Sequence, residues 1–130
     1  MSLIIPEPPL PRAVGLYRAY LRVTIVGHAL AVVALTYVVL ADWTLPAEIP
    51  ANLIRGGATL LLPIAVLVGF TQVVLLRLRP SPAAYGLHQA NLLAAISGII
   101  FLPLALPLWW QWRRAEVQRY FGVEPVGPGP

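Results

Sequence analysis

The sequence predicts an all-α integral membrane protein with three transmembrane helices. Three apolar runs, residues 23–41, 56–76 and 86–108, contain no Asp, Glu, Lys or Arg. Each run reaches or exceeds the roughly 20 residues that a helix needs to cross a hydrocarbon core about 30 Å thick. The composition agrees, because 58% of the residues are hydrophobic and only 11% are charged. A mean hydropathy of +0.77 lies outside the range expected for a water-soluble domain.

The chain is short enough that we expect residues 1–130 to form a single membrane domain. Prolines at positions 6, 8, 9 and 11 exclude a helix from the first residues, and Gly122 is a plausible stop for the last helix. The expected segments are a Pro-rich arm (1–12), helices over 13–42, 53–77 and 86–121, the last with a polar extension, and a Pro/Gly-rich tail (122–130).

The arginines decide the orientation of the first two helices but not the third. With the N-terminus in the cytoplasm, the acidic loop of Asp42 and Glu48 lies outside, as the positive-inside rule favours. Three full spans place five arginines on one side and four on the other: Arg12, Arg18, Arg22, Arg77 and Arg79 against Arg55, Arg113, Arg114 and Arg119. The difference of five against four is almost no bias. The first residues do not resemble a cleavable signal peptide, so we expect the first span to remain in the mature protein. We expect the chain in a membrane of the bacterial inner-membrane type, with its N-terminus in the cytoplasm.

The alternative is two spans plus a re-entrant or interfacial third segment. A hairpin bent at Pro103–Pro107 would leave Arg55 alone on one side, against eight arginines on the other. A re-entrant loop in lipid leaves backbone groups unpaired at several kcal/mol each unless other protein covers them. We therefore expect three spans, with the C-terminus on the side opposite to the N-terminus.

Small residues recur at four-residue spacing in every run, which lets neighbouring helices approach closely. The expected helix-packing residues are Gly27, Ala31, Ala65, Gly69, Ala90, Ala94 and Gly98. Alanine and glycine are also common in any membrane helix, so composition alone can produce such matches.

Five polar side chains fall within about two turns of one membrane face if all three runs span. This expected polar layer comprises His28, Thr71, Gln72, Gln89 and Asn91. Interhelical hydrogen bonds explain it most simply. A sharper reading makes His28 a ligand or proton-exchanging group, because an ionisable residue inside a membrane is a functional candidate. A quinone in the layer, or a haem held between His28 and His88, follows from that reading, although His88 is expected at the wet interface.

Basic and aromatic side chains collect at the ends of the runs, where headgroups lie. The expected interfacial residues are Arg18, Arg22, Arg77, Arg79, Trp109, Trp110, Trp112, Arg113 and Arg114. Because the arginines occupy these positions, the net charge of +4 does not indicate nucleic-acid binding. The polar stretch after the tryptophans is an anchor or a docking helix.

No carboxylate lies inside a run, and no phosphate-binding loop or metal-ligand spacing occurs. The sequence also has no cysteine. We therefore expect no enzyme and no bound metal. The favoured hypothesis is a non-catalytic accessory or assembly subunit of a larger membrane complex, with lipid and other membrane subunits, or further copies of this chain, as partners. The alternative is an oligomeric binding or transport unit that uses the His28 layer for a quinone, haem or solute.

Overall fold

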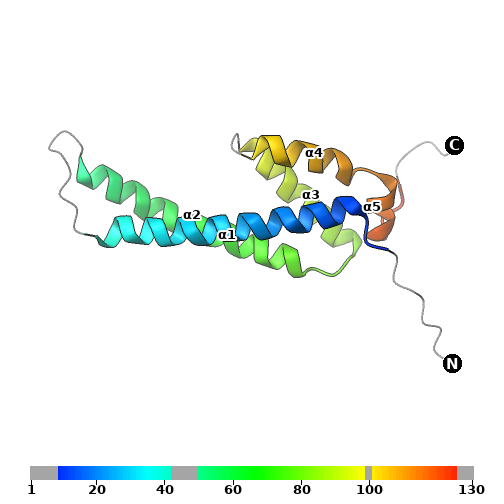
Figure 1. Ribbon diagram of the computed structural model, residues 1–130, viewed down its shortest axis with the longest axis horizontal. Coiled ribbons are helices and arrows are strands. Elements are labelled where there is room, and N and C mark those ends of the chain that lie inside the picture. The colour runs from blue at the N-terminus through cyan, green and yellow to red at the C-terminus, as the bar shows by residue number, and fades with distance from the viewer. Residues whose placement is uncertain (1–8, 42–49, 99–100, 126–130) are drawn as a thin grey trace, which may run out of the picture. The chain divides into compact units, whose positions relative to one another are not determined.

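A computed structural model describes residues 9–41, 50–98 and 101–125 (Figure 1). Of these residues 83% are helical and none is in a strand, which confirms the all-α prediction. The helices are α1 (Arg12–Leu40), α2 (Ala51–Arg77), α3 (Pro82–Ser97), α4 (Leu102–Trp112) and α5 (Ala115–Tyr120). Most of the Pro-rich arm, the loop with Asp42 and Glu48, and the end of the tail lie outside the described residues.

The described part of the chain divides into two compact units. The hairpin unit is Tyr20–Leu76, which holds most of α1 and nearly all of α2. The terminal unit combines Met1–Ala19 with Arg77–Pro130, so the first two turns of α1 join α3, α4 and α5. Helix α1 therefore contributes to both units.

In the hairpin unit α1 and α2 run antiparallel. Near the middle, a Cβ added to Gly69 would lie 3.1 Å from the Cβ of His28. Near the loop, Nη2 of Arg55 donates a hydrogen bond to the carbonyl of Ala41 at 2.8 Å. Arg55 thus binds the end of α1, where the helix dipole favours a cation.

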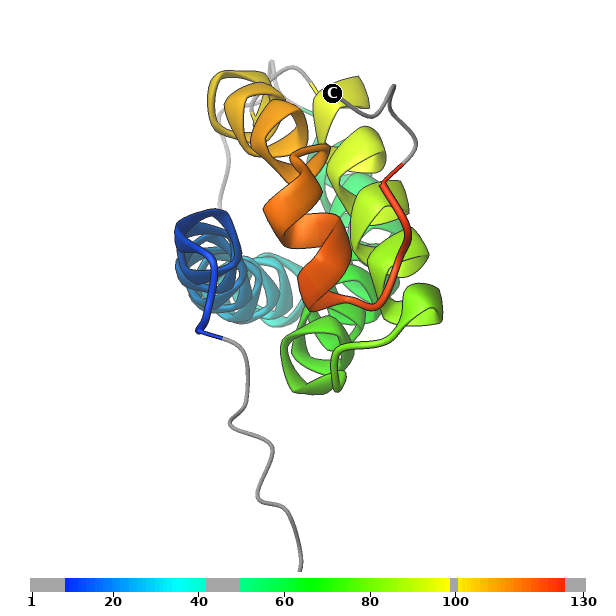
Figure 2. The same cartoon turned by 90° about the vertical axis from the view of Figure 1, so that its right-hand side faces the viewer.

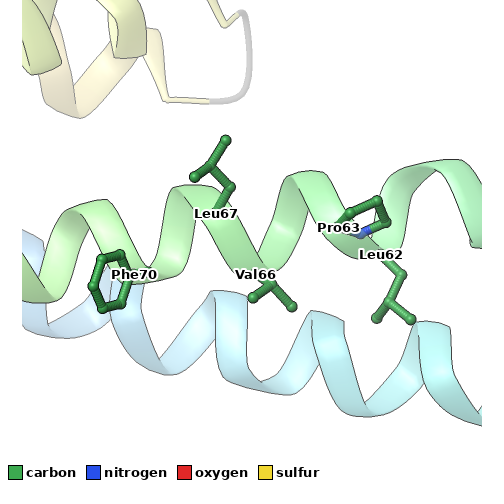
Figure 3. A pocket seen from close by; sticks show the side chains of 5 residues that line it. All are labelled: Leu62, Pro63, Val66, Leu67 and Phe70. Atoms are coloured by element: carbon green, nitrogen blue, oxygen red, sulfur yellow. The ribbon is translucent and has the colours of Figure 1, made fainter.

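Helices α1 and α2 are each long and apolar enough to cross a membrane, with 29 and 27 residues. They begin directly after prolines, Pro11 and Pro50, whose carbonyls accept N–H groups of the first turn. Helix α2 continues through Pro63. An open apolar groove of about 480 Å³ surrounds this proline and is lined by Leu62, Pro63, Val66, Leu67 and Phe70. Figure 3 shows Leu62 and Val66 extending toward α1 and Leu67 pointing away from it.

The third apolar run does not form the expected helix over residues 86–121. Helix α3 begins at Pro82, four residues before the expected start. The Ser81 hydroxyl accepts a hydrogen bond from the N–H of Ala84, and proline suits the first turn of a helix. The helix then stops at Ser97, and Gly98 follows in an extended conformation. At about 1.5 Å per residue, the 16 residues of α3 extend roughly 24 Å and the 11 residues of α4 roughly 17 Å. Neither reaches the thickness of a hydrocarbon core, and the prediction of three spanning helices is not confirmed.

The position of the break also differs from the expected bend at Pro103–Pro107. Both prolines lie within α4, and the chain changes direction before them. Pro103 is in the first turn of α4, where its missing N–H costs no helical hydrogen bond. Proline therefore starts the second arm of this hairpin instead of forming its turn.

Helices α3 and α4 pack as an antiparallel hairpin, and α5 crosses its open end beside the start of α1 (Figure 2). Tyr85 near the start of α3 stacks on Trp112 at the end of α4, with ring centroids 6.3 Å apart. Gly122 ends α5 with a positive φ of 70°, as the sequence indicated. The N–H of Val123 then donates to the carbonyl of Gln118 at 2.8 Å, which satisfies the helix end.

Candidate functional site

The most elaborate side-chain arrangement in the terminal unit is a cluster of rings around His88. Tyr17 comes from α1, Tyr85 and His88 from α3, Trp112 from the end of α4, and Phe121 follows α5. The ring of His88 lies 5.2 Å from Tyr17, 5.5 Å from Trp112 and 5.6 Å from Phe121 between centroids. We call these five residues the His88 cluster. It joins three consecutive helices, α3, α4 and α5, to the distant start of α1.

The His88 cluster is the core of its unit. Trp112 has no exposed surface, Tyr17 is 1% exposed and His88 is 5% exposed. Aromatic pairs in such edge and tilted arrangements add stabilisation beyond the buried area. Among the described residues, Nδ1 of His88 and Nε1 of Trp112 are buried without a hydrogen-bond partner.

His88 is held in its neutral form. Burial, and to a lesser extent the positive charge of Arg18, lower the pKa of His88 from 6.5 to about 4. At neutral pH the imidazole therefore acts as an uncharged ring in the packing.

Three hydrogen bonds fix the rim of the cluster. Asn91 Nδ2 donates to the Tyr17 hydroxyl at 2.9 Å, which links α3 to the start of α1. The Tyr85 hydroxyl donates to the carbonyl of Trp112 at 3.4 Å and accepts from Nε2 of Gln118 at 3.5 Å. Each bond connects different helices, so the rim depends on the fold of the whole unit.

The structure buries two residues that the sequence analysis placed at the membrane interface. His88 was placed at the wet interface and Trp112 in the interfacial aromatic belt, but both are buried in the cluster. The neighbouring Trp110 is 69% exposed and does suit a membrane interface. A usable signal existed in the sequence: Tyr85, His88 and Leu92 recur at helical spacing and are all buried on one face of α3.

A second feature of the terminal unit is a cavity of about 240 Å³ at the start of α1. It is lined by Arg12, Ala13, Leu16, Gln111, Arg114 and Glu116. Its walls thus combine two guanidinium groups, an amide and a carboxylate with two apolar side chains. Arg12 and Arg114 are both exposed. We call this cavity the Arg12 pocket; the sequence analysis did not anticipate it, because its residues are about a hundred positions apart.

The residues of the expected polar layer divide between the units. His28, Thr71 and Gln72 belong to the hairpin unit, whereas Gln89 and Asn91 belong to the terminal unit. Nδ1 of His28 donates to the carbonyl of Thr24 at 2.6 Å, and the hydroxyl of Thr71 donates to that of Leu67 at 2.9 Å. These bonds lie within single helices. Gln72 is buried, and Gln89 is half-buried.

The expected packing residues also differ from one another. Gly69 sits in close contact with His28, so a small residue is required there. Around Gly27 there is open space, with nothing within 4 Å of an added Cβ. Ala31 and Ala65 are half-buried, whereas Ala90, Ala94 and Gly98 form an exposed stripe on α3 and at its end.

The expected interfacial arginines lie mostly at the surface. Arg22, Arg77, Arg79, Arg113 and Arg114 are exposed and Arg18 is half-buried. The guanidinium carbon of Arg113 lies 5.3 Å from the ring centroid of Trp109, in a cation–π contact.

Within the described residues, no group of three or more His, Cys, Asp or Glu side chains could hold a metal ion. His28 and His88 belong to different units. The terminal unit thus contains two distinct candidate features: the His88 cluster, with a buried neutral imidazole, and the Arg12 pocket, a small cavity lined by two arginines. The chain matches no protein-family model, no curated protein and no solved structure at a significant level.

Proposed function

We propose that this chain is an integral membrane protein in which α1 and α2 span the bilayer and α3 and α4 form a re-entrant hairpin. The apolar windows of α1 and α2 are only 6% and 11% buried within the chain. The core helix of a soluble domain would bury most of such a surface, whereas lipid solvates it without cost. Lipid is therefore the medium that suits these two helices.

The geometry of the terminal unit supports the re-entrant arrangement. The stacking of Tyr85 on Trp112 places the two open ends of the α3–α4 hairpin together, and Tyr17 of α1 contacts Trp112 as well. The hairpin thus enters and leaves on the side where α1 begins. On this topology every arginine except Arg55 lies on one side, which the positive-inside rule assigns to the cytoplasm.

Labelling of single cysteines tests this topology, because the natural chain has none. Leu10→Cys and Val123→Cys flank the helical region and Pro50→Cys precedes α2. A membrane-impermeant thiol reagent should reach positions 10 and 123 from the same side and position 50 from the other. Labelling of positions 123 and 50 from the same side would contradict the re-entrant hairpin and support three full spans.

Within this membrane protein we further propose the role of a non-catalytic accessory or assembly subunit. The observation that carries this role is the exposed outer face of the α3–α4 hairpin. Non-helical backbone at membrane depth persists only where protein covers it, so a re-entrant hairpin favours a neighbouring subunit. The exposed stripe of Ala90, Ala94 and Gly98 allows a partner helix to approach this hairpin closely.

Copurification in mild detergent tests the accessory role. We expect larger membrane subunits to copurify with the natural chain and to be lost from the double variant Ala90→Leu/Ala94→Leu. Ala29→Leu/Ala34→Leu enlarges two exposed alanines of α1 instead of α3. This double variant is the matched control and should retain the partners. His28→Ala should retain them too. Recovery of a homo-oligomer alone, with a bound chromophore or solute, would instead favour the binding or transport alternative.

A further inference from the structure

Among the remaining features, the Arg12 pocket is the one that combines a cavity with converging charge. Arg12 at the start of α1 and Arg114 at the α4–α5 junction line the same cavity although they are 102 positions apart. Glu116 is the single carboxylate in the lining, so the two guanidinium groups outnumber it. No ion pair of Glu116 is found among the described residues. A net positive charge therefore faces the cavity.

The chemistry of the lining indicates the class of ligand. The planar guanidinium group binds phosphate oxygens through paired N–H donors, and the Gln111 side chain adds an amide. A cavity of about 240 Å³ is smaller than the roughly 300–1,000 Å³ that organic ligands and cofactors occupy. It has room for a phosphate group and its immediate substituents.

The surroundings identify the source of that phosphate. Leu16 and Ala13 give the cavity an apolar wall, and both belong to a helix that is apolar enough to span a membrane. Trp109 and Trp110 precede Gln111 on α4, and such indoles lie at headgroup depth. The cavity thus has an apolar wall at Leu16 and a cationic wall at the two arginines. A phospholipid offers the matching sequence of groups, from its acyl chains to its phosphate.

We propose that the Arg12 pocket binds the phosphate of an anionic phospholipid, with Arg12 and Arg114 as its ligands and Leu16 beside the glycerol backbone. The inference rests on the membrane insertion proposed above, but it is independent of any partner subunit. All residues of the pocket belong to the terminal unit.

Native mass spectrometry of the chain purified in neutral detergent tests the site, with phosphatidylglycerol and phosphatidylcholine as the added lipids. We expect retained phosphatidylglycerol on the natural chain and roughly tenfold less on Arg12→Gln/Arg114→Gln. The control Arg79→Gln/Arg119→Gln removes the same charge at two exposed arginines outside the pocket, and it should retain the lipid. Equal loss in both double variants would overturn the proposal.

Two further arms complete the experiment. Glu116→Gln removes the carboxylate from the lining and should increase the retention of phosphatidylglycerol, and unchanged retention would contradict the site even if the arginine variant failed to fold. Inorganic phosphate at the same concentration should not displace the lipid. Binding of phosphate in place of phosphatidylglycerol would assign the pocket to a free anion and overturn the lipid claim. Lipid retention is measured on the isolated chain and does not depend on copurified subunits. A failure of the accessory role is therefore distinguishable from a failure of the lipid site.

Discussion

The two units of this chain differ in how several of their polar side chains are satisfied. In the hairpin unit the side chains of His28, Thr36 and Thr71 bond to carbonyls four residues earlier in their own helices. In the terminal unit Asn91 bonds to Tyr17, 74 residues away, and Tyr85 bonds to the end of a different helix. Bonds within one helix thus satisfy these three side chains of the hairpin unit, where the bond from Arg55 to Ala41 is an exception. Bonds between helices satisfy Tyr85 and Asn91 in the terminal unit.

The membrane topology proposed above accounts for this difference. A helix in lipid gains nothing from hiding apolar side chains, because lipid tails are as apolar as leucine. Its polar side chains must therefore be satisfied locally. The short helices of the terminal unit cannot span a bilayer, and they are held together by a buried aromatic core around Trp112. Local sequence thus determines the hairpin unit, and tertiary packing determines the terminal unit.

The largest effect is expected at the centre of the aromatic core. Trp112→Ala should destabilise the terminal unit by about 3–5 kcal/mol, because the indole is fully buried among four other rings. Thermal unfolding followed by circular dichroism in detergent measures the loss. Trp110→Ala on the same helix removes a 69% exposed indole and should change stability little. Equal losses in both variants would mean that the terminal unit has no core of its own.

In the hairpin unit the corresponding weak point is a glycine. Gly69→Val should cost about 1–3 kcal/mol, because an added Cβ already approaches that of His28 to 3.1 Å and two further methyl groups must be accommodated. Gly57→Val on the same helix meets nothing within 4 Å and is the control. The same thermal unfolding assay compares them. If Gly57→Val were the more damaging, helix propensity rather than contact with α1 would govern this unit.

A pH-dependent effect should be confined to the terminal unit. The pKa of His88 is lowered to about 4 in the fold against an ordinary 6.5, so the unfolded chain binds the proton more readily. The stability contributed by neutral His88 is complete above pH 6.5, falls as the pH drops through 6.5, and levels off near pH 4. Arg18 and the hydroxyls of Tyr17 and Tyr85 are the other ionisable groups nearby.

Two measurements check this expectation. Ring NMR signals of His88 in micelles should titrate near pH 4, and His88→Phe should remove its contribution to the pH slope of the unfolding temperature. Glu116 and Glu124 remain in that variant, so the difference between the two chains isolates the histidine. A His88 signal that titrated near 6.5 would show that the ring is exposed to water.

The smallest expected effect concerns the bond that joins α3 to α1. Tyr17→Phe removes the hydroxyl that accepts from Asn91 and leaves the ring in place, which should cost about 1 kcal/mol. A double-mutant cycle with Asn91→Ala separates this bond from the other contacts of each residue. Additive losses would indicate that the two side chains do not stabilise each other.

The sequence anticipated the helical class and the helices α1 and α2, but it misjudged the third apolar run. Its length of more than 20 residues favoured a span, and the break at Gly98 carries no strong local signal because glycine is common in membrane helices. The burial of His88 and Trp112 was missed for a related reason. Each residue type is common at membrane interfaces, and nothing local reveals that Tyr17 and Phe121 enclose them.

By itself, the sequence determined the two long helices α1 and α2 and their apolar character, because helix length, proline position and hydropathy act over neighbouring residues. Only the tertiary structure decided that α3 and α4 turn back on each other, that five rings meet at His88, and that Arg12 and Arg114 face one cavity. These features depend on residues up to about a hundred positions apart, and the packing that selects them exists only once the helices have assembled.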